Sequence, residues 1–141
     1  MDAAAMRKRL EEARVAHLAT ADAEGRPHVV PIAFAHHDEN LYFVVDDKPK
    51  RSRDLKRLRN IAGNPRVSVL VDHYEDDWTR LWWVRVDGVA HVLVHDAEAQ
   101  RAIDLLARKY GQYRTAKPPG PVIEITILRM TGWAAAENPA C

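Results

Sequence analysis

Alternating hydrophobic and polar positions recur along most of this chain and predict a sheet of short, sequential strands. The candidate strands are residues 15–21, 28–35, 41–45, 66–71, 81–94 and 122–128, and residues 132–136 can extend the last one. Most are joined by turns of a few residues, which is typical of antiparallel pairing. Pro31 predicts an edge position or a bulge, because proline cannot donate a ladder hydrogen bond. Gly88, midway along the longest strand, predicts a bulge or a bend.

Three other segments show helical spacing. Residues 2–14 carry an apolar face behind Asp2, which can cap the first turn. Leu55, Leu58, Ile61 and Ala62 recur at helical intervals between the third and fourth strands. Residues 96–110 form a third amphipathic segment, which Gly111 is expected to end. We therefore predict a mainly β (α+β) fold: a small antiparallel barrel of six or seven strands, with two or three helices at its ends.

Composition narrows the class of protein. A chain of 141 residues with 47% hydrophobic residues is expected to form one domain, residues 1–141, around a real core. The formal net charge of +1 gives no reason to expect general binding to nucleic acid or membranes. Cys141, the single cysteine, rules out an internal disulfide framework and a cysteine-based zinc site. With no signal-peptide core and no long apolar run, we expect a cytoplasmic protein with no membrane partner.

Positive charge is concentrated between the third and fourth strands. A third of the 21 lysines and arginines lie in one segment, opposed by a single acid: Lys48, Lys50, Arg51, Arg53, Lys56, Arg57 and Arg59. Pro49 suits the approach to a short helix, and the Gly63-Asn64-Pro65 sequence suits its end. Cationic side chains beside the free amides of a helix start can hold a phosphate. A merely solvated helix face is the alternative, but the density of charge favours an anionic ligand.

Motifs for the common catalytic chemistries are missing from the sequence. There is no dinucleotide-binding, phosphate-loop, zinc-protease or nucleophile-elbow signature. His36 and His37 are adjacent in a turn and lack further ligands, so we predict no metal site. The chain does offer several large aromatics: Tyr42, Phe43, Tyr74, Trp78, Trp82 and Trp83. They can form a slot for a planar ring, or they can pack in the core or at a subunit interface.

Four stretches, taken in order, resemble the split-barrel flavin-binding superfamily of the pyridoxamine 5′-phosphate oxidase class. Residues 17–34 (HLATADAEGRPHVVPIAF) resemble its opening hairpin. The LYFVV strand, the basic turn and LKRLRNIAGNPRVSVLVD resemble its phosphate-binding segment, and DWTRLWWVRVDGVAHV and VIEITILRMTGWAA resemble its later strands. Within the superfamily, the chain looks most like the small actinobacterial enzymes that use the deazaflavin coenzyme F420.

The resemblance implies a split barrel and a homodimer with two cofactor sites at the subunit interface. By position, it places the cofactor phosphate against Lys48, Lys50, Arg51, Arg57 and Asn60. It places the ring along the strands that hold Val30, Pro31, Ile32 and Tyr42. Trp82 and Trp83 would close the pocket from the partner subunit.

Our leading hypothesis is an F420-dependent oxidoreductase that reduces an organic acceptor. Because the cofactor carries the redox chemistry, we expect no catalytic side chain of the general-base type. One alternative is an FMN-dependent oxidase acting on a pyridoxal-type phosphate, and another is a non-catalytic carrier of flavin or haem. A nucleic-acid binder using the basic helix is a further alternative, which the near-neutral charge disfavours. The partners that we expect are a second copy and a small organic molecule, without nucleic acid.

Overall fold

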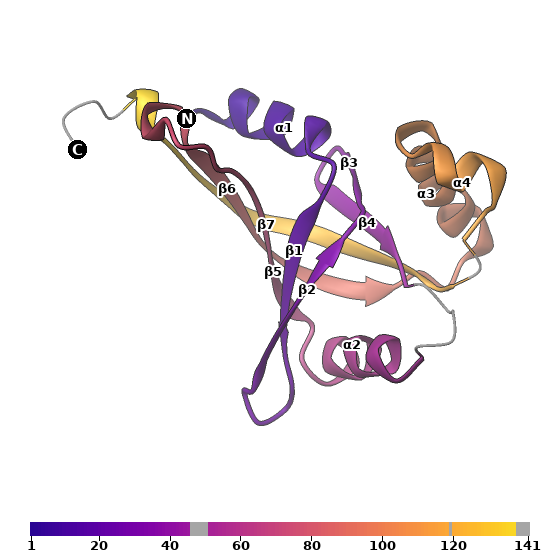
Figure 1. The fold of residues 1–141 in the computed structure, drawn as a ribbon. Helices are drawn as coiled ribbons and strands as arrows, with labels where there is room; N and C mark the ends of the chain where they lie inside the picture. The colour runs from indigo at the N-terminus through magenta and orange to yellow at the C-terminus, as the bar shows by residue number, and fades with distance from the viewer. Residues whose placement is uncertain (46–50, 119, 138–141) are drawn as a thin grey trace.

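The computed structural model describes residues 1–45, 51–118 and 120–137; of residues 51–55 and 57 it describes only the backbone. Within these residues, seven strands form one antiparallel sheet in the order β2-β1-β5-β6-β7-β4-β3. The strands are β1 (Ala16–Ala21), β2 (Pro27–Ile32), β3 (Ala35–His37), β4 (Asn40–Val44), β5 (Arg66–His73), β6 (Trp82–Val92) and β7 (Val122–Ala134). The sheet curls into a half-barrel (Figure 1), which confirms the predicted mainly β fold.

The alternation of the sequence becomes the two faces of this sheet. On β5, Val67, Val69 and Val71 are buried, while the residues between them are more exposed. Successive side chains of a strand point to opposite faces, so one set enters the core and the other lies on the outside. The same pattern on β1 buries Leu18 completely. The concave side thus holds the core, and the side chains on the convex side stay partly exposed.

Two predicted irregularities occur where the sequence placed them. The register of β6 against β7 shifts between Asp87 and Gly88. A side chain at Gly88 would bring Cβ within 2.4 Å of the Thr126 carbonyl oxygen, so only glycine fits there. Pro31 lies on β2, the edge strand, opposite His17.

The register shift leaves an extra residue on β7. Asp87 pairs with Arg129 and Gly88 pairs with Ile127, so Leu128 has no partner on β6 and its side chain is 64% exposed. A bulge of this kind reverses which residues of the strand face the core. From Ile123 to Ile127 the buried residues of β7 are therefore the odd-numbered ones, whereas Met130 packs against the core beyond the bulge.

Four α-helices surround the described part of the sheet: α1 (Ala3–Glu12), α2 (Arg51–Gly63), α3 (Asp96–Lys109) and α4 (Gly111–Thr115). Figure 1 shows α1 over one end of the sheet, α2 below the other end, and α3 with α4 flanking β4. The Asp2 carboxylate accepts from the Ala5 amide at 2.8 Å, as predicted for the cap of α1. One helix more than expected is present, because Gly111 begins α4 instead of leading into a loop.

Tyr110 attaches α3 to the sheet. Its hydroxyl accepts a hydrogen bond from the buried Phe34 amide at 3.1 Å. The hydroxyl proton faces the carbonyl oxygens of Arg14 and Phe34, at 3.0 and 3.1 Å. Burial raises the pKa of this phenol, so the proton needed for the contact is retained at neutral pH. The anchor fixes the helical flank against the β2–β3 connection.

Candidate functional site

An open groove of about 580 Å³ lies on the convex face of the sheet. Its walls are mostly aromatic and aliphatic, from Ala19, Val29, Leu70, Tyr74, Leu81, Trp82, Trp83 and Trp133. Its polar side chains are those of His17, Ser68, Asp72, His73 and Arg85. We call this set of thirteen residues the aromatic groove.

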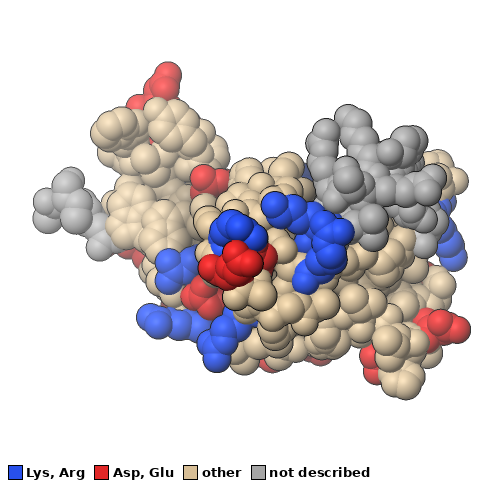
Figure 2. Space-filling model, turned by 90° about the horizontal axis from the view of Figure 1, so that it is seen from below, with Lys and Arg blue, Asp and Glu red and all other residues tan. Residues whose placement is uncertain are grey.

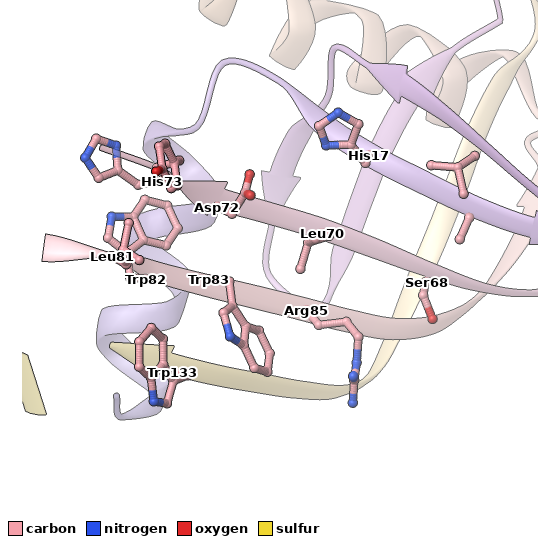
Figure 3. A pocket seen from close by; sticks show the side chains of 13 residues that line it. His17, Ser68, Leu70, Asp72, His73, Leu81, Trp82, Trp83, Arg85 and Trp133 are labelled. Carbon is pink, nitrogen blue, oxygen red and sulfur yellow. The ribbon is translucent and has the colours of Figure 1, made fainter. Parts of the chain in front are cut away.

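Strand register explains why these residues meet. Outward-facing positions of neighbouring strands lie side by side, so Asp72 on β5 pairs with Trp83 on β6, which in turn pairs with Trp133 on β7. In a second row, His17 on β1 pairs with Leu70 on β5, which in turn pairs with Arg85 on β6. Figure 3 shows the indoles of Trp83 and Trp133 next to each other, with His17 on the far side of the groove. Residues of five strands, β1, β2, β5, β6 and β7, therefore build one continuous surface.

One end of the aromatic groove is fixed by a polar network. Ser68 donates its hydroxyl proton to the Asp87 carboxylate at 2.7 Å, and the Arg85 Nε donates to the same carboxylate at 3.3 Å. The Arg85 guanidinium also lies 6.0 Å from the centre of the Trp83 ring. These contacts hold a cation at the edge of an otherwise apolar wall. A ligand with a flat ring and a polar edge suits this arrangement.

The other end opens into a second hollow of about 390 Å³. It shares His73, Leu81 and Trp82 with the groove, and adds Arg9, Thr79, Arg80, Ala134 and Ala136. We call this hollow the cationic pocket. Trp82 forms the wall between them, with His73 stacked on it at 6.3 Å between ring centres.

The described part of the basic segment belongs to α2, which lies at the opposite end of the sheet. Lys48 and Lys50 are outside the described residues, and the side chains of Arg51 and Arg57 on α2 are not described either. Figure 2 shows this underside of the molecule, where Lys and Arg side chains gather with Asp and Glu side chains among them. The predicted phosphate contacts therefore stay predictions.

Asn60 has a partner inside the protein. Its side chain is 4% exposed, and its amide donates to the Thr20 hydroxyl oxygen on β1 at 3.2 Å. Thr20 is also 4% exposed. This buried bond holds α2 against β1 and so positions the basic helix. The predicted cofactor contact of Asn60 would have to coexist with this bond.

The residues predicted to lie along the ring are distributed over both faces. Ile32 is buried and Val30 packs against the core, whereas Pro31 is exposed on the edge strand. Tyr42 faces α3, where burial and the neighbouring Glu124 carboxylate raise the pKa of its hydroxyl to about 12. Of the predicted site residues with described side chains, Trp82 and Trp83 are the ones that line the aromatic groove.

Sequence analysis missed several groove residues, above all Trp133. Leu70 and Arg85 stand at positions of their strands that alternate with the buried residues, so the sequence could place them on the outer face. That alternation does not say which strands are neighbours. Trp133 required the β7 bulge as well, because continued alternation from Ile127 would have pointed it into the core.

Two further observations, on metal ligands and on membrane-spanning helices, apply to the residues that the structure describes. Its His, Cys, Asp and Glu side chains form no group of three or more arranged to hold a metal ion. None of its helices combines the length and the apolar character needed to cross a membrane.

Comparison with known proteins agrees with this geometry. The family model described as pyridoxamine 5′-phosphate oxidase matches residues 3–134. The crystal structure of an FAD-binding protein from Mesorhizobium loti is 28% identical and superposes with a TM-score of 0.72, covering 94% of each chain. A conserved hypothetical protein of Mycobacterium tuberculosis shares the fold, with a TM-score of 0.76 at 20% identity over 99% of this chain and 88% of that one.

A curated relative is the heme oxygenase HutZ of Vibrio cholerae, which is 26% identical over 106 residues. The match takes in 72% of this chain and 57% of HutZ, so the chain spans little more than half the length of that relative. Because the family match extends over nearly all of the sequence, the chain belongs to the pyridoxamine 5′-phosphate oxidase family.

Proposed function

We propose that this protein is an F420-dependent oxidoreductase that reduces a small organic acceptor. The observation that carries the proposal is the aromatic groove, in which Trp83 and Trp133 remain partly exposed on the convex face of the sheet and Trp82 lines one end. Large indoles left in contact with solvent mark a surface that binds something. Membership of a flavin-binding class of split barrels makes a flavin-type ring the natural occupant.

The described residues fit such a ring. The groove volume of about 580 Å³ is in the usual range for small-molecule sites, roughly 300–1,000 Å³. Trp83 and Trp133 offer flat faces for stacking, and Ser68 and Arg85 offer polar contacts at the edge. The cofactor phosphate would be held by the basic segment, with Lys48, Lys50, Arg51 and Arg57 as the proposed contacts.

The bound deazaflavin would supply the hydride. The chain would contribute binding, orientation and exclusion of water, which is the usual division of labour in cofactor enzymes. The rigid pairing of β6 with β7 would hold the indoles in place, and the Asn60–Thr20 bond would hold the basic helix. A general base is not needed for this role.

The proposal includes a homodimer that packs through the convex face. Val29 is 62% exposed there, and the half-exposed indoles of Trp83 and Trp133 lie on the same face. Asp72 and Arg85 supply opposite charges that a two-fold partner could pair. Light scattering is expected to give about twice the chain mass of 16.0 kDa. Trp83→Ala is expected to weaken dimerisation by at least about tenfold, because buried aromatics dominate interface energy.

Two other cofactors have support of their own. The FAD-binding relative, similar over 94% of its length, favours an ordinary flavin, FAD or FMN, in an oxidase acting on a pyridoxal-type phosphate or in a carrier. The similarity to HutZ favours haem, and His17 and His73 place imidazoles at the groove. These readings share one site and differ in its occupant.

A titration separates them. Purified protein is mixed in turn with F420, FMN and haemin, and binding is followed by cofactor fluorescence or by the haem absorbance band. Lys50→Ala and Arg57→Ala are expected to weaken F420 binding by roughly ten- to a hundredfold, the value of a charge-assisted phosphate contact. Arg101→Ala, which removes an exposed charge on α3, is the matched control, and melting curves on each variant detect unfolding.

Preferential F420 binding that depends on the basic segment supports the proposal. Tight binding of FMN or haemin, with F420 bound weakly or not at all, would replace it with the corresponding alternative. Equal binding by the parent, Lys50→Ala and Arg57→Ala would show that the phosphate is held elsewhere.

A further inference from the structure

The cationic pocket adjoins the aromatic groove at Trp82. The two hollows share Trp82, His73 and Leu81, so they lie next to each other at this end of the sheet. Arg9 from α1 and Arg80 from the short turn η1 (Trp78–Arg80) line the far side. The pocket therefore differs in chemistry from the groove that leads into it.

Arg9 stacks on Trp82, and no described side chain pairs with its guanidinium. Its guanidinium carbon lies 4.5 Å from the centre of the Trp82 ring, in cation–π geometry. The guanidinium itself has no hydrogen bond or ion pair with a residue that the structure describes. Arg7, on the same helix, contrasts with it, because that guanidinium binds the Asp38 carbonyl and the Glu39 carboxylate. The stacked Arg9 thus keeps its N–H donors available to a ligand.

Arg80 supplies a second guanidinium. Its Nε lies 3.4 Å from a Glu75 carboxylate oxygen, which also contacts His73. The turn that carries Arg80 is capped by Asp77, which accepts from the Thr79 amide at 3.1 Å. The Asp77 carboxylate also acts on Arg80 electrostatically. Arg80 therefore has two acidic neighbours, whereas no described carboxylate pairs with the Arg9 guanidinium.

Two guanidinium groups beside an indole wall recognise a planar anion well. Arginine pairs with a carboxylate through two parallel N–H bonds, and its fork geometry suits that planar group. The shared wall of Trp82 and Leu81 suits a flat hydrocarbon ring. We propose that the cationic pocket binds the carboxylate of a flat, conjugated acceptor whose ring lies against Trp82. This identification of the ligand as the acceptor rests on the proposed function, whereas the recognition itself requires no cofactor.

Two probes of the same shape test the site in the cofactor-free protein. They are 2-naphthoate and its uncharged methyl ester, and binding is followed by quenching of tryptophan fluorescence. We expect the parent to bind the acid at least about tenfold more tightly than the ester, because only the acid offers a charge-assisted pair. Raising the ionic strength is expected to reduce that preference.

The variants Arg9→Gln and Arg80→Gln are each expected to reduce the preference to less than about threefold, with little change in ester affinity. Taking the ratio of acid to ester within each variant cancels any change in indole fluorescence. Lys8→Gln is the matched control, since it removes an exposed charge from the same helix. It is expected to keep the preference of the parent.

Equal affinity for acid and ester in the parent would overturn the proposal, as would failure of both probes to bind. A preference that survives both arginine substitutions, or that is lost equally in Lys8→Gln, would do the same. F420 titration of the same proteins separates this result from the proposed function. An acid preference that depends on Arg9 and Arg80 in a protein that binds no F420 would keep the pocket and refute the cofactor. Normal F420 binding without the preference would refute the pocket alone.

Discussion

Lys109 is a charge that the fold places in an unfavourable environment. Its Nζ lies 4.1 Å from the centre of the Phe34 ring and 5.4 Å from that of Tyr110. The ammonium is buried without a hydrogen-bond partner among the described residues. Burial, followed by repulsion from Arg14, lowers the pKa of this amine from 10.5 to about 8. We predict that Lys109→Met stabilises the protein at neutral pH.

The size of the effect follows from the pKa difference. Each unit corresponds to about 1.4 kcal/mol, so the shift would be worth roughly 3 kcal/mol if the group were fully buried. Lys109 is partly exposed, and solvent screening reduces the expected gain to about 1–2 kcal/mol. Loss of the cation–π contacts with Phe34 and Tyr110 would offset part of that gain, by about 0.5–1 kcal/mol. A net stabilisation near 1 kcal/mol is expected, since methionine fills a similar volume without a charge.

The sign of the pH dependence distinguishes this explanation from simple repacking. The pKa is lower in the folded state, so the unfolded chain binds more protons between pH 8 and 10.5. The free energy of unfolding contributed by Lys109 therefore rises with pH across that window. Below pH 8 the amine is charged in both states, and the folded protein bears the full cost of burial. The advantage of Lys109→Met should thus be largest at pH 7 and shrink as the pH approaches 10.5.

Urea unfolding followed by tryptophan fluorescence, at several pH values between 7 and 10.5, measures both quantities. Lys8→Met, at an exposed position on α1, is the control for loss of a lysine without burial, and it should change stability by less than about 0.5 kcal/mol. The reasoning would be refuted if Lys109→Met were less stable than the parent at pH 7. A stabilisation that did not vary with pH would indicate better packing instead of relief of a buried charge.

Three further substitutions test contacts that position the site. Thr20→Val is expected to cost about 1–3 kcal/mol in urea unfolding, because it leaves the buried amide of Asn60 without its acceptor; an unchanged stability would contradict the role given to that bond. Gly120→Ala is expected to lower stability by about 1–3 kcal/mol or more, since its Cβ would fall 1.6 Å from the Val45 carbonyl oxygen, and a normal melting temperature would show that the loop has room. Tyr110→Phe is expected to cost about 1–3 kcal/mol by leaving the buried Phe34 amide unpaired, and amide hydrogen exchange at that position should speed up.

Much of the sheet could be predicted because a strand buried on one face has a period of two. On β5, the valines at 67, 69 and 71 are buried, and the sequence shows that alternation directly. The cap at Asp2 and the bulge at Gly88 were predictable for the same reason, since each is a local steric or hydrogen-bonding requirement. Features that depend only on neighbouring residues leave their mark in the sequence.

Features that depend on distant residues could not be predicted from the sequence. Helix α3 ends at Lys109, just before Gly111, as predicted, but the sequence did not show that the chain begins α4 at once. Asn60 shows the same limit, because a polar residue on a basic helix looks available until its buried partner Thr20 is known. A tertiary contact decided the case of Asn60.

The aromatic groove depends on one extra residue in β7. Up to Ile127 the odd-numbered residues of this strand are buried, and strict continuation would carry Trp133 into the core. Leu128, unpaired at the bulge, shifts the parity by one, so that Trp133 comes out on the convex face opposite Trp83. Gly132 then faces inward, where its missing side chain makes room for Met6 of α1, whose sulfur would lie 2.8 Å from a Cβ. The same shift thus lets α1 close over the end of the barrel. Helix α1 also carries Arg9, which stacks on Trp82. The bulge therefore affects both hollows, because it turns Trp133 toward the groove and leaves room for the helix that carries Arg9.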